Sequence, residues 1–281
     1  MRLELQKIID DYKIKNNEEY EKLNFQLRKL INPITHIKMN DPYLIKVIDE
    51  VPLFFEIFHY GREKDTVNNL MNGINEKEFN LLKNILQILV EFNKLTKNKS
   101  LPYSSILRHL YQYKLINKLL PECKSFFEIG PGAGFLPIIS VLSNKEINYL
   151  CTDISEAYFL TQKIIYKYFG LLNTDLKKVK KGQITHFPWW DYLNLSKLYN
   201  DNIDCIIINH AVCEMDESAI RYLLKLSLKI KNKYIFIESA GHDEFLSFEK
   251  VKSIFDEFNY KITYERNNTY IFKYSNLYKK K

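Results

Sequence analysis

Hydrophobic positions in the first third of the chain recur every three or four residues, the spacing of one face of a helix. A first run of such positions ends at Asn32-Pro33, and a second begins after Asp41-Pro42, where Asp41 suits an N-cap and Pro42 the first helical position. A third run extends from Glu76 to Leu95. Residues 1–100 are therefore predicted to form a helical N-terminal region.

The pattern changes after residue 124, where short apolar runs alternate with longer helical patterns. This alternation is typical of βαβ units on a parallel sheet. Strands are predicted at 125–129, 148–152, 183–187, 204–209, 234–238, 261–265 and 270–274, with helices at 104–120, 136–142, 156–169, 217–229 and 247–258. The last two strands have no helix between them, so a hairpin joins them. Residues 101–281 are therefore predicted to form an α/β domain that ends in a hairpin.

Composition and charge narrow the class of protein. Hydrophobic residues make up 46% and charged residues 27% of the 281 residues, which excludes wholesale disorder. The net charge is +7, but three of the positive charges are the terminal Lys279 to Lys281. The remaining bias is weak, so a nucleic acid is not the expected partner. The run from Lys177 to Lys181 is interpreted as a solvated turn.

The cysteines and the length of the apolar runs indicate the cellular compartment of the protein. The four cysteines contain no CxxC pair, which argues against a zinc knuckle or a redox motif. Cys151 and Cys205 lie inside apolar runs and are predicted to be buried. The longest clean apolar run, from Phe135 to Leu142, is far shorter than the ~20 residues of a membrane helix. Because the first residues also lack the pattern of a signal peptide, we expect a cytoplasmic protein without a membrane span.

One glycine-rich run carries most of the chemical information. Glu128 closes the first predicted strand, and Gly130, Gly132 and Gly134 follow it directly before a helix. Glycines let a ligand approach the backbone closely, and a helix N-terminus offers unpaired N–H groups. Phe135 stands where a dinucleotide fingerprint has its third glycine, and no Lys-Ser/Thr follows, so neither that fingerprint nor a P-loop is present.

This run resembles the first motif of the class I S-adenosylmethionine (SAM)-dependent methyltransferases, and the order of elements is similar from about residue 104 to 275. The resemblance implies a seven-stranded Rossmann-like sheet of order 3-2-1-4-5-7-6 with an antiparallel last strand. It also implies SAM as cofactor, with Asp153 accepting hydrogen bonds from both ribose hydroxyls. The residues expected to contact SAM are Glu128, Gly130, Gly132, Gly134, Asp153, Asn209 and Arg108. A Rossmann-like domain with a decayed site is the alternative.

The end of the fourth strand suggests the substrate. Many nitrogen-methylating enzymes of this superfamily carry an Asn/Asp-Pro-Pro-aromatic tetrapeptide there, whereas this chain has Asn209-His210-Ala211-Val212. The run through Met215 is similar instead to the sugar O-methyltransferases of bacterial polysaccharide gene clusters. That resemblance implies a sugar or nucleotide-sugar substrate and a role in polysaccharide biosynthesis.

Methyl transfer to a sugar hydroxyl needs a proton acceptor, because the hydroxyl ionises only well above neutral pH. His210 titrates in a suitable range and is the expected base, with Glu214 holding its imidazole or binding substrate. Glu238 and His242, after the fifth strand, form a second candidate pair. A helix-capping role is the alternative for His210. A divalent metal is a further alternative, but it is not favoured because no metal-ligand spacing is present.

Other interpretations remain open at the level of sequence. An RNA methyltransferase is suggested by the basic tail, and a non-catalytic SAM-binding regulatory subunit by the N-terminal helices. Those helices are expected to act as a lid over the substrate or as a homodimer contact. The loop from His186 to Asp191 contains the pair Trp189-Trp190, which could flank an adenine or a sugar. At least one of the two tryptophans is expected to pack in the core.

Overall fold

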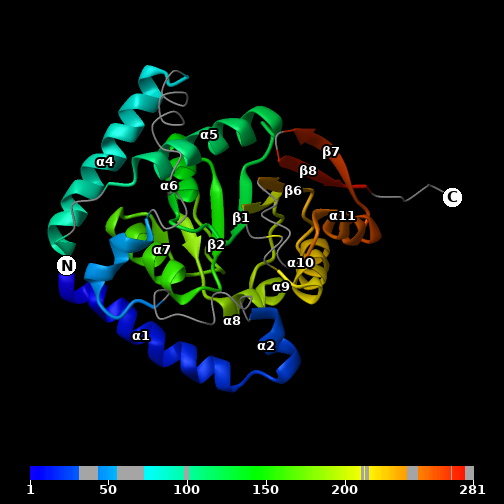
Figure 1. Cartoon of the computed structure of the whole chain (residues 1–281), viewed down its shortest axis with the longest axis horizontal. Coiled ribbons are helices and arrows are strands. Elements are labelled where there is room, and N and C mark those ends of the chain that lie inside the picture. The colour runs from blue at the N-terminus through cyan, green and yellow to red at the C-terminus, as the bar shows by residue number, and fades with distance from the viewer. Residues whose placement is uncertain are drawn as a thin grey trace.

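The computed structural model describes residues 1–31, 44–55, 73–97, 101–209, 212, 215–238, 246–266 and 268–275 (Figure 1). The N-terminal region contains α1 (Arg2–Glu21), α2 (Phe25–Ile31), η3 (Ile48–Phe54) and α4 (Glu76–Thr96). The strands are β1 (Ser125–Ile129), β2 (Asn148–Thr152), β3 (Leu172–Asn173), β4 (Ile184–His186), β5 (Cys205–Asn209), β6 (Tyr234–Glu238), β7 (Tyr260–Arg266) and β8 (Thr269–Tyr274). The remaining helices are α5 (Tyr103–Leu119), α6 (Phe135–Ser143), α7 (Glu156–Tyr168), α8 (Trp189–Tyr192), α9 (Leu195–Leu198), α10 (Glu217–Lys229) and α11 (Phe248–Glu257).

The strands form one sheet in the order β3-β4-β2-β1-β5-β6-β8-β7. All neighbouring pairs are parallel except β6 with β8 and β7 with β8, which are antiparallel. Without β3 this is the predicted order 3-2-1-4-5-7-6, so the predicted fold class is confirmed. The sheet has eight strands rather than seven, because Leu172 and Asn173 pair with β4 at the edge. A strand of two residues is too short to produce an alternating pattern in the sequence.

Each face of the sheet carries its own hydrophobic core, because successive side chains of a strand point to opposite faces. Tyr149 and Cys151 of β2 lie in a core shared with α4, α5, α6 and α7. Leu150, between them, lies in the core shared with α10 and α11. The layers of helices on both faces explain why the central strands read as continuous apolar runs (Figure 1).

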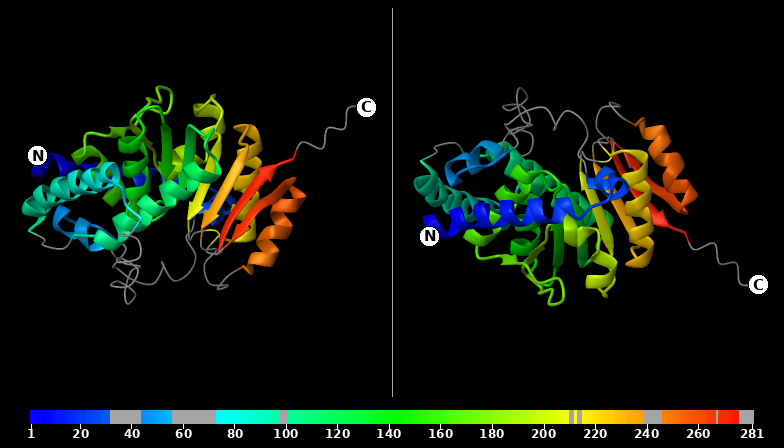
Figure 2. Two further views of the ribbon diagram at one scale, coloured as in Figure 1. Left: turned by 90° about the horizontal axis from the view of Figure 1, so that it is seen from above. Right: turned by 90° about the horizontal axis from the view of Figure 1, so that it is seen from below.

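The helix α1 is part of the first core. Its residues Leu5, Ile9 and Tyr12 are buried together with side chains of α7. The ring of Tyr12 stacks on Phe159 of α7, with the ring centroids 4.7 Å apart. From there α2 packs against α10 on the opposite layer. The two N-terminal helices therefore run along the molecule from one helix layer to the other (Figure 2).

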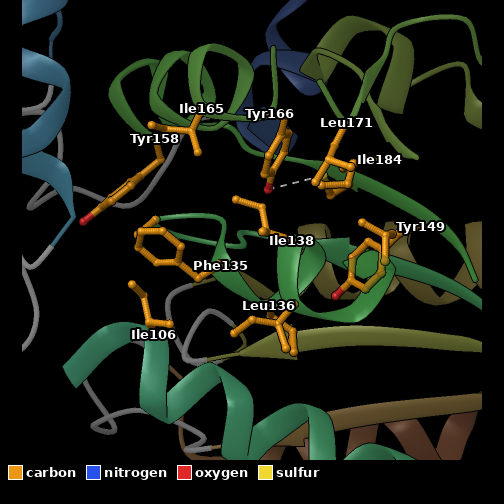
Figure 3. Packing of buried hydrophobic residues seen from close by; sticks show 14 of the residues in the cluster. Ile106, Phe135, Leu136, Ile138, Tyr149, Tyr158, Ile165, Tyr166, Leu171 and Ile184 are labelled. Atoms are coloured by element: carbon orange, nitrogen blue, oxygen red, sulfur yellow. Dashed lines mark hydrogen bonds between the residues drawn. The ribbon is translucent and has the colours of Figure 1, made fainter. Parts of the chain in front are cut away.

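The segment η3 packs beside the starts of α6 and α7. The ring of Phe55 lies edge-on to Phe135, the first residue of α6, at a centroid distance of 5.8 Å. The ring of Phe54 lies edge-on to Tyr158 in the first turn of α7, at 5.9 Å. Figure 3 shows Phe135 between Tyr158 and Ile106 of α5. Residues 44–55 therefore lie next to the glycine-rich loop that precedes α6.

Several local predictions differ from the structure in detail. The first helical run forms two helices, α1 and α2, instead of one. The helix α5 begins at Tyr103, one residue earlier than predicted, and its N-cap Pro102 makes no side-chain cap hydrogen bond. The predicted helix start at Asp41-Pro42 lies outside the described residues.

Burial agrees with the cysteine prediction. Cys151 and Cys205 are fully buried, as their apolar neighbours predicted, and Cys123 is also a buried free thiol. Cys213 lies outside the described residues. Within the described ranges, no helix is both long and apolar enough to cross a bilayer.

The contribution of α1 to stability can be measured with two leucines on the same helix. Leu5 is fully buried, whereas Leu3 is 86% exposed. We expect Leu5→Ala to lower the free energy of unfolding by about 2–5 kcal/mol, since it leaves a cavity in the core. Leu3→Ala should change it by less than about 0.5 kcal/mol. Urea denaturation measures both, and equal small effects would mean that α1 does not share the core.

Candidate active site

The glycine-rich loop between β1 and α6 has a backbone that requires glycine. Gly130, Gly132 and Gly134 all have positive φ angles, of 69°, 57° and 81°. A Cβ atom on Gly134 would also lie only 2.6 Å from the hydroxyl oxygen of Tyr166. The loop therefore leads directly into the N-terminus of α6, where backbone N–H groups lack helical partners and can bind a ligand.

Glu128, at the end of β1, is a fully buried carboxyl group. The hydroxyl of Tyr149 donates to its Oε2 at 2.8 Å, and Nδ2 of Asn209 donates to its Oε1 at 3.0 Å. Burial raises the pKa of Glu128 to about 8, although both hydrogen bonds lower it. Burial therefore favours the protonated form of this carboxyl group, whereas a cationic ligand group beside it would favour the ionised form.

Asp153 follows β2 and lies at the same sheet edge as the glycine-rich loop, 6% exposed. Its Oδ1 accepts a hydrogen bond from the backbone N–H of Ser155 at 2.9 Å. Its Oδ2 accepts one from Nε2 of Gln162, also at 2.9 Å. Because a carboxylate can accept about four hydrogen bonds, both bonds are compatible with further donors such as ribose hydroxyls.

Two polar residues near Asp153 were not predicted as part of the site. Gln162 of α7 is fully buried, and His186 at the end of β4 contacts its Oε1 through Nε2 at 3.0 Å. The imidazole of His186 stacks on Phe159 at 4.3 Å. Burial lowers the pKa of His186 well below its usual value, so the ring is neutral. In the sequence, Gln162 could have been identified because it is an amide on the apolar face of a predicted helix.

Glu238, at the end of β6, lies opposite Asn209 of β5 in the sheet register. Burial raises the pKa of Glu238, while a hydrogen bond with Gln112 and the charge of Arg108 lower it. The predicted cofactor residue Arg108 is thus placed near this carboxyl group. Within the part of the chain that the structure describes, neither Oε2 of Glu238 nor Oδ1 of Asn209 has a hydrogen-bond partner, although both atoms are buried. Two acceptors on neighbouring strand ends suit a ligand that donates hydrogen bonds.

The structure brings Glu128, the three loop glycines, Asp153, Asn209 and Glu238 to one edge of the sheet. His210, Glu214 and His242 lie outside the described residues, and their roles stay predictions. Among the residues that are described, no group of three or more His, Cys, Asp or Glu side chains could hold a metal ion.

The tryptophan pair lies in α8 rather than in an open loop. Trp189 is buried, which confirms that at least one of the pair packs in the core. Its indole Nε1 donates to Oδ1 of Asn16 at 2.8 Å. Trp190 stacks on Tyr12, with ring centroids 5.6 Å apart. Both tryptophans thus contact α1.

Comparison with known proteins gives similarity in structure alone. No protein-family model and no curated protein matches the chain. The N-terminal domain of EvdMO1 with SAH bound matches 59% of this chain and 81% of its own, at 9% identity and a TM-score of 0.43. Magnesium protoporphyrin IX methyltransferase (ChlM) from Synechocystis PCC 6803 with bound SAM matches 75% of this chain and 97% of its own, at 13% identity and a TM-score of 0.41. TrmK of M. capricolum in complex with SAH matches 59% of this chain and 68% of its own, at 17% identity and a TM-score of 0.39.

Two of these solved structures hold SAH and one holds SAM. The sheet order that the resemblance to the class I methyltransferases implies is shown by this chain's own strand pairing. Because all three TM-scores are below 0.5, the cofactor and the substrate have to be inferred from this chain's own residues.

The raised pKa of Glu128 predicts a pH dependence of stability. The raised pKa of about 8 keeps this proton on the folded state over a range where an unfolded glutamate, with its ordinary pKa of 4.5, has lost it. The free energy of unfolding should therefore fall as the pH rises through this window, by at most about 1.4 kcal/mol per pH unit for one proton. Urea denaturation from pH 5 to 9 measures the slope.

Glu128→Gln should remove this part of the slope, because an amide does not titrate. The control Glu76→Gln, at an exposed position in α4, should keep it. If the curve of Glu128→Gln runs parallel to that of the wild type, the carboxyl group of Glu128 is ionised throughout.

Proposed function

We propose that this protein is a SAM-dependent O-methyltransferase that acts on a sugar or a sugar-like hydroxyl. The observation that supports it most is the pairing of the left-handed glycine-rich loop with Asp153 at one sheet edge. The loop would let a cofactor approach the backbone, and the carboxylate would accept hydrogen bonds from a vicinal diol.

The residues around β1 and β5 suit the positively charged end of SAM. Glu128 is a carboxyl group whose ionised form a nearby cation would stabilise. Asn209 presents a buried Oδ1 without a partner among the described residues, which an ammonium group could satisfy. When bound, SAM supplies a methyl group on a sulfonium, which is already an activated leaving group. The chain must then add orientation and a proton acceptor.

The proton acceptor is proposed to be His210, directly after β5, with Glu214 as its partner. Glu238 is the second candidate, because burial raises the pKa of its carboxylate and so makes it a stronger proton acceptor than an exposed glutamate. Its Oε2, which has no hydrogen-bond partner among the described residues, would also accept a hydrogen bond from a substrate hydroxyl. Arg108 and Gln112 of α5 would hold this carboxylate in place.

The helical region of residues 1–100 is proposed to cover the substrate side of the 101–281 domain or to form a dimer contact. Its support is the packing of η3 beside Phe135 and Tyr158, which flank the glycine-rich loop and the start of α7. A sugar or nucleotide sugar in the site would then lie close to residues of the N-terminal region.

The cofactor can be tested by calorimetry with SAH. We expect micromolar binding, about −8 kcal/mol. Asp153→Ala should weaken it by about 1–3 kcal/mol, since ribose donors would lose their acceptor. The control Asp201→Ala removes an exposed carboxylate far along the chain and should leave the affinity unchanged. Tight binding of NADH without binding of SAH would refute the proposed function.

The substrate and the base can be tested together with SAM that carries a labelled methyl group. Nucleotide sugars should accept the label, and RNA should not. His210→Ala should leave SAH affinity within a few-fold of the wild type while turnover falls about 10²–10⁴-fold. In the wild type, kcat/KM should rise with pH through a step at about pH 6–7. The variant should lack this step.

The outcomes separate the candidates. Near-normal turnover of His210→Ala together with a large loss in Glu238→Gln would assign the base to Glu238. Transfer of the label to RNA would mean that the substrate is a nucleic acid and not a sugar. SAH binding without transfer to any acceptor would favour a regulatory SAM-binding subunit.

A further inference from the structure

Gln162 joins three parts of the candidate site through one buried amide. Its Nε2 donates to the backbone carbonyl of Gly132 at 2.8 Å and to Oδ2 of Asp153 at 2.9 Å. Its Oε1 faces Nε2 of His186 at 3.0 Å. The side chain comes from α7, whereas the three partners come from the loop after β1 and from the ends of β2 and β4.

The chemistry of these partners determines which way the amide points. The carbonyl of Gly132 and the carboxylate of Asp153 are both acceptors, so the NH₂ group must face them. The oxygen then faces His186, whose Nε2 must carry the hydrogen and donate it. A reversed amide would put its oxygen against two acceptors, which is electrostatically unfavourable. The neutral state of His186, which its burial favours, supplies the one donor that this arrangement needs.

The bonds of Gln162 connect parts that local structure leaves separate. The backbone N–H of Ser155 also donates to Asp153, but Ser155 is only two residues away, so this bond orders the local turn. Gln162 connects the same carboxylate to the glycine-rich loop, which follows β1, the strand next to β2. The Cγ atom of Gln162 also lies 3.1 Å from where a Cβ of Gly134 would be, so it packs directly under the loop.

We propose that Gln162 is a positioning residue that holds the glycine-rich loop and Asp153 at a set separation before a ligand binds, with His186 orienting its amide. This inference rests on the proposed function, because the ligand that needs both groups is SAM. Gln162 would act through the loop and the carboxylate and not by contact with the reacting atoms. Preorganisation of this kind increases affinity because less ordering remains to be done on binding.

The first test is a thermodynamic cycle on SAH binding measured by calorimetry. Gln162→Met replaces the amide by an unbranched side chain of similar size and should weaken binding about tenfold. Asp153→Ala should weaken it as well. Because part of the effect of Gln162 passes through Asp153, the loss in the double variant should be smaller than the product of the two separate losses. Losses that simply multiply would mean that Gln162 has no link to Asp153.

The second test uses charge and does not depend on the first variant folding. Gln162→Glu keeps the shape but, once ionised, places a carboxylate against the acceptors of Asp153 and Gly132. The ratio of its dissociation constant to that of the wild type should therefore rise at least tenfold from pH 5 to pH 8. Taking the ratio at each pH removes the dependence that both proteins share through Glu128. A purely structural residue predicts a constant ratio.

A neighbour on α7 provides the matched control. Thr161 is also fully buried, and its hydroxyl has no hydrogen-bond partner within the described ranges. Thr161→Val should leave SAH affinity within twofold and KM for SAM unchanged, whereas Gln162→Met should raise KM for SAM with little change in kcat. If the wild type does not bind SAH, the proposed function fails. If the wild type binds SAH and Asp153→Ala loses affinity, but both Gln162 variants bind normally at every pH, the positioning role is wrong.

Discussion

The parallel pairing of β1 with β2 on one side and β5 on the other is the constraint on which the candidate site depends. In this register Ile129 lies beside Thr152 and Ile208, so all three strands end at the same level. Parallel strands place their carboxyl ends at one edge, and the residues that follow meet there. Glu128, Asp153 and Asn209 are far apart in the chain but become neighbours for this reason alone.

The polar groups at this edge are held under conditions that oppose ionisation. Burial raises the pKa of Glu128 and of Glu238, and it keeps His186 neutral. The hydrogen bonds from Tyr149, Asn209 and Gln162 offset part of the desolvation. Within the described residues, Oδ1 of Asn209 and Oε2 of Glu238 still lack a hydrogen-bond partner, and a ligand with donor groups would satisfy them.

The N-terminal helices belong physically to the same body as the sheet. Tyr12 lies between Phe159 and Trp190, and Phe159 in turn stacks on His186, whose ring reaches the amide of Gln162. A column of stacked rings thus extends from α1 to the residues around Asp153. The same aromatic contacts therefore join α1 to this edge of the sheet.

The sequence by itself determined the order of the seven longer strands and of the longer helices between them, the terminal hairpin and the glycine-rich loop, because periodicity and glycine requirements are local. It also indicated Glu128, Asp153 and Asn209 through their positions at predicted strand ends. Only the tertiary structure decided that α1 packs on α7, that Trp189 contacts Asn16, and that Gln162 joins Gly132, Asp153 and His186. Such contacts depend on which elements meet in space, and no local pattern of residues encodes the partner of a buried amide.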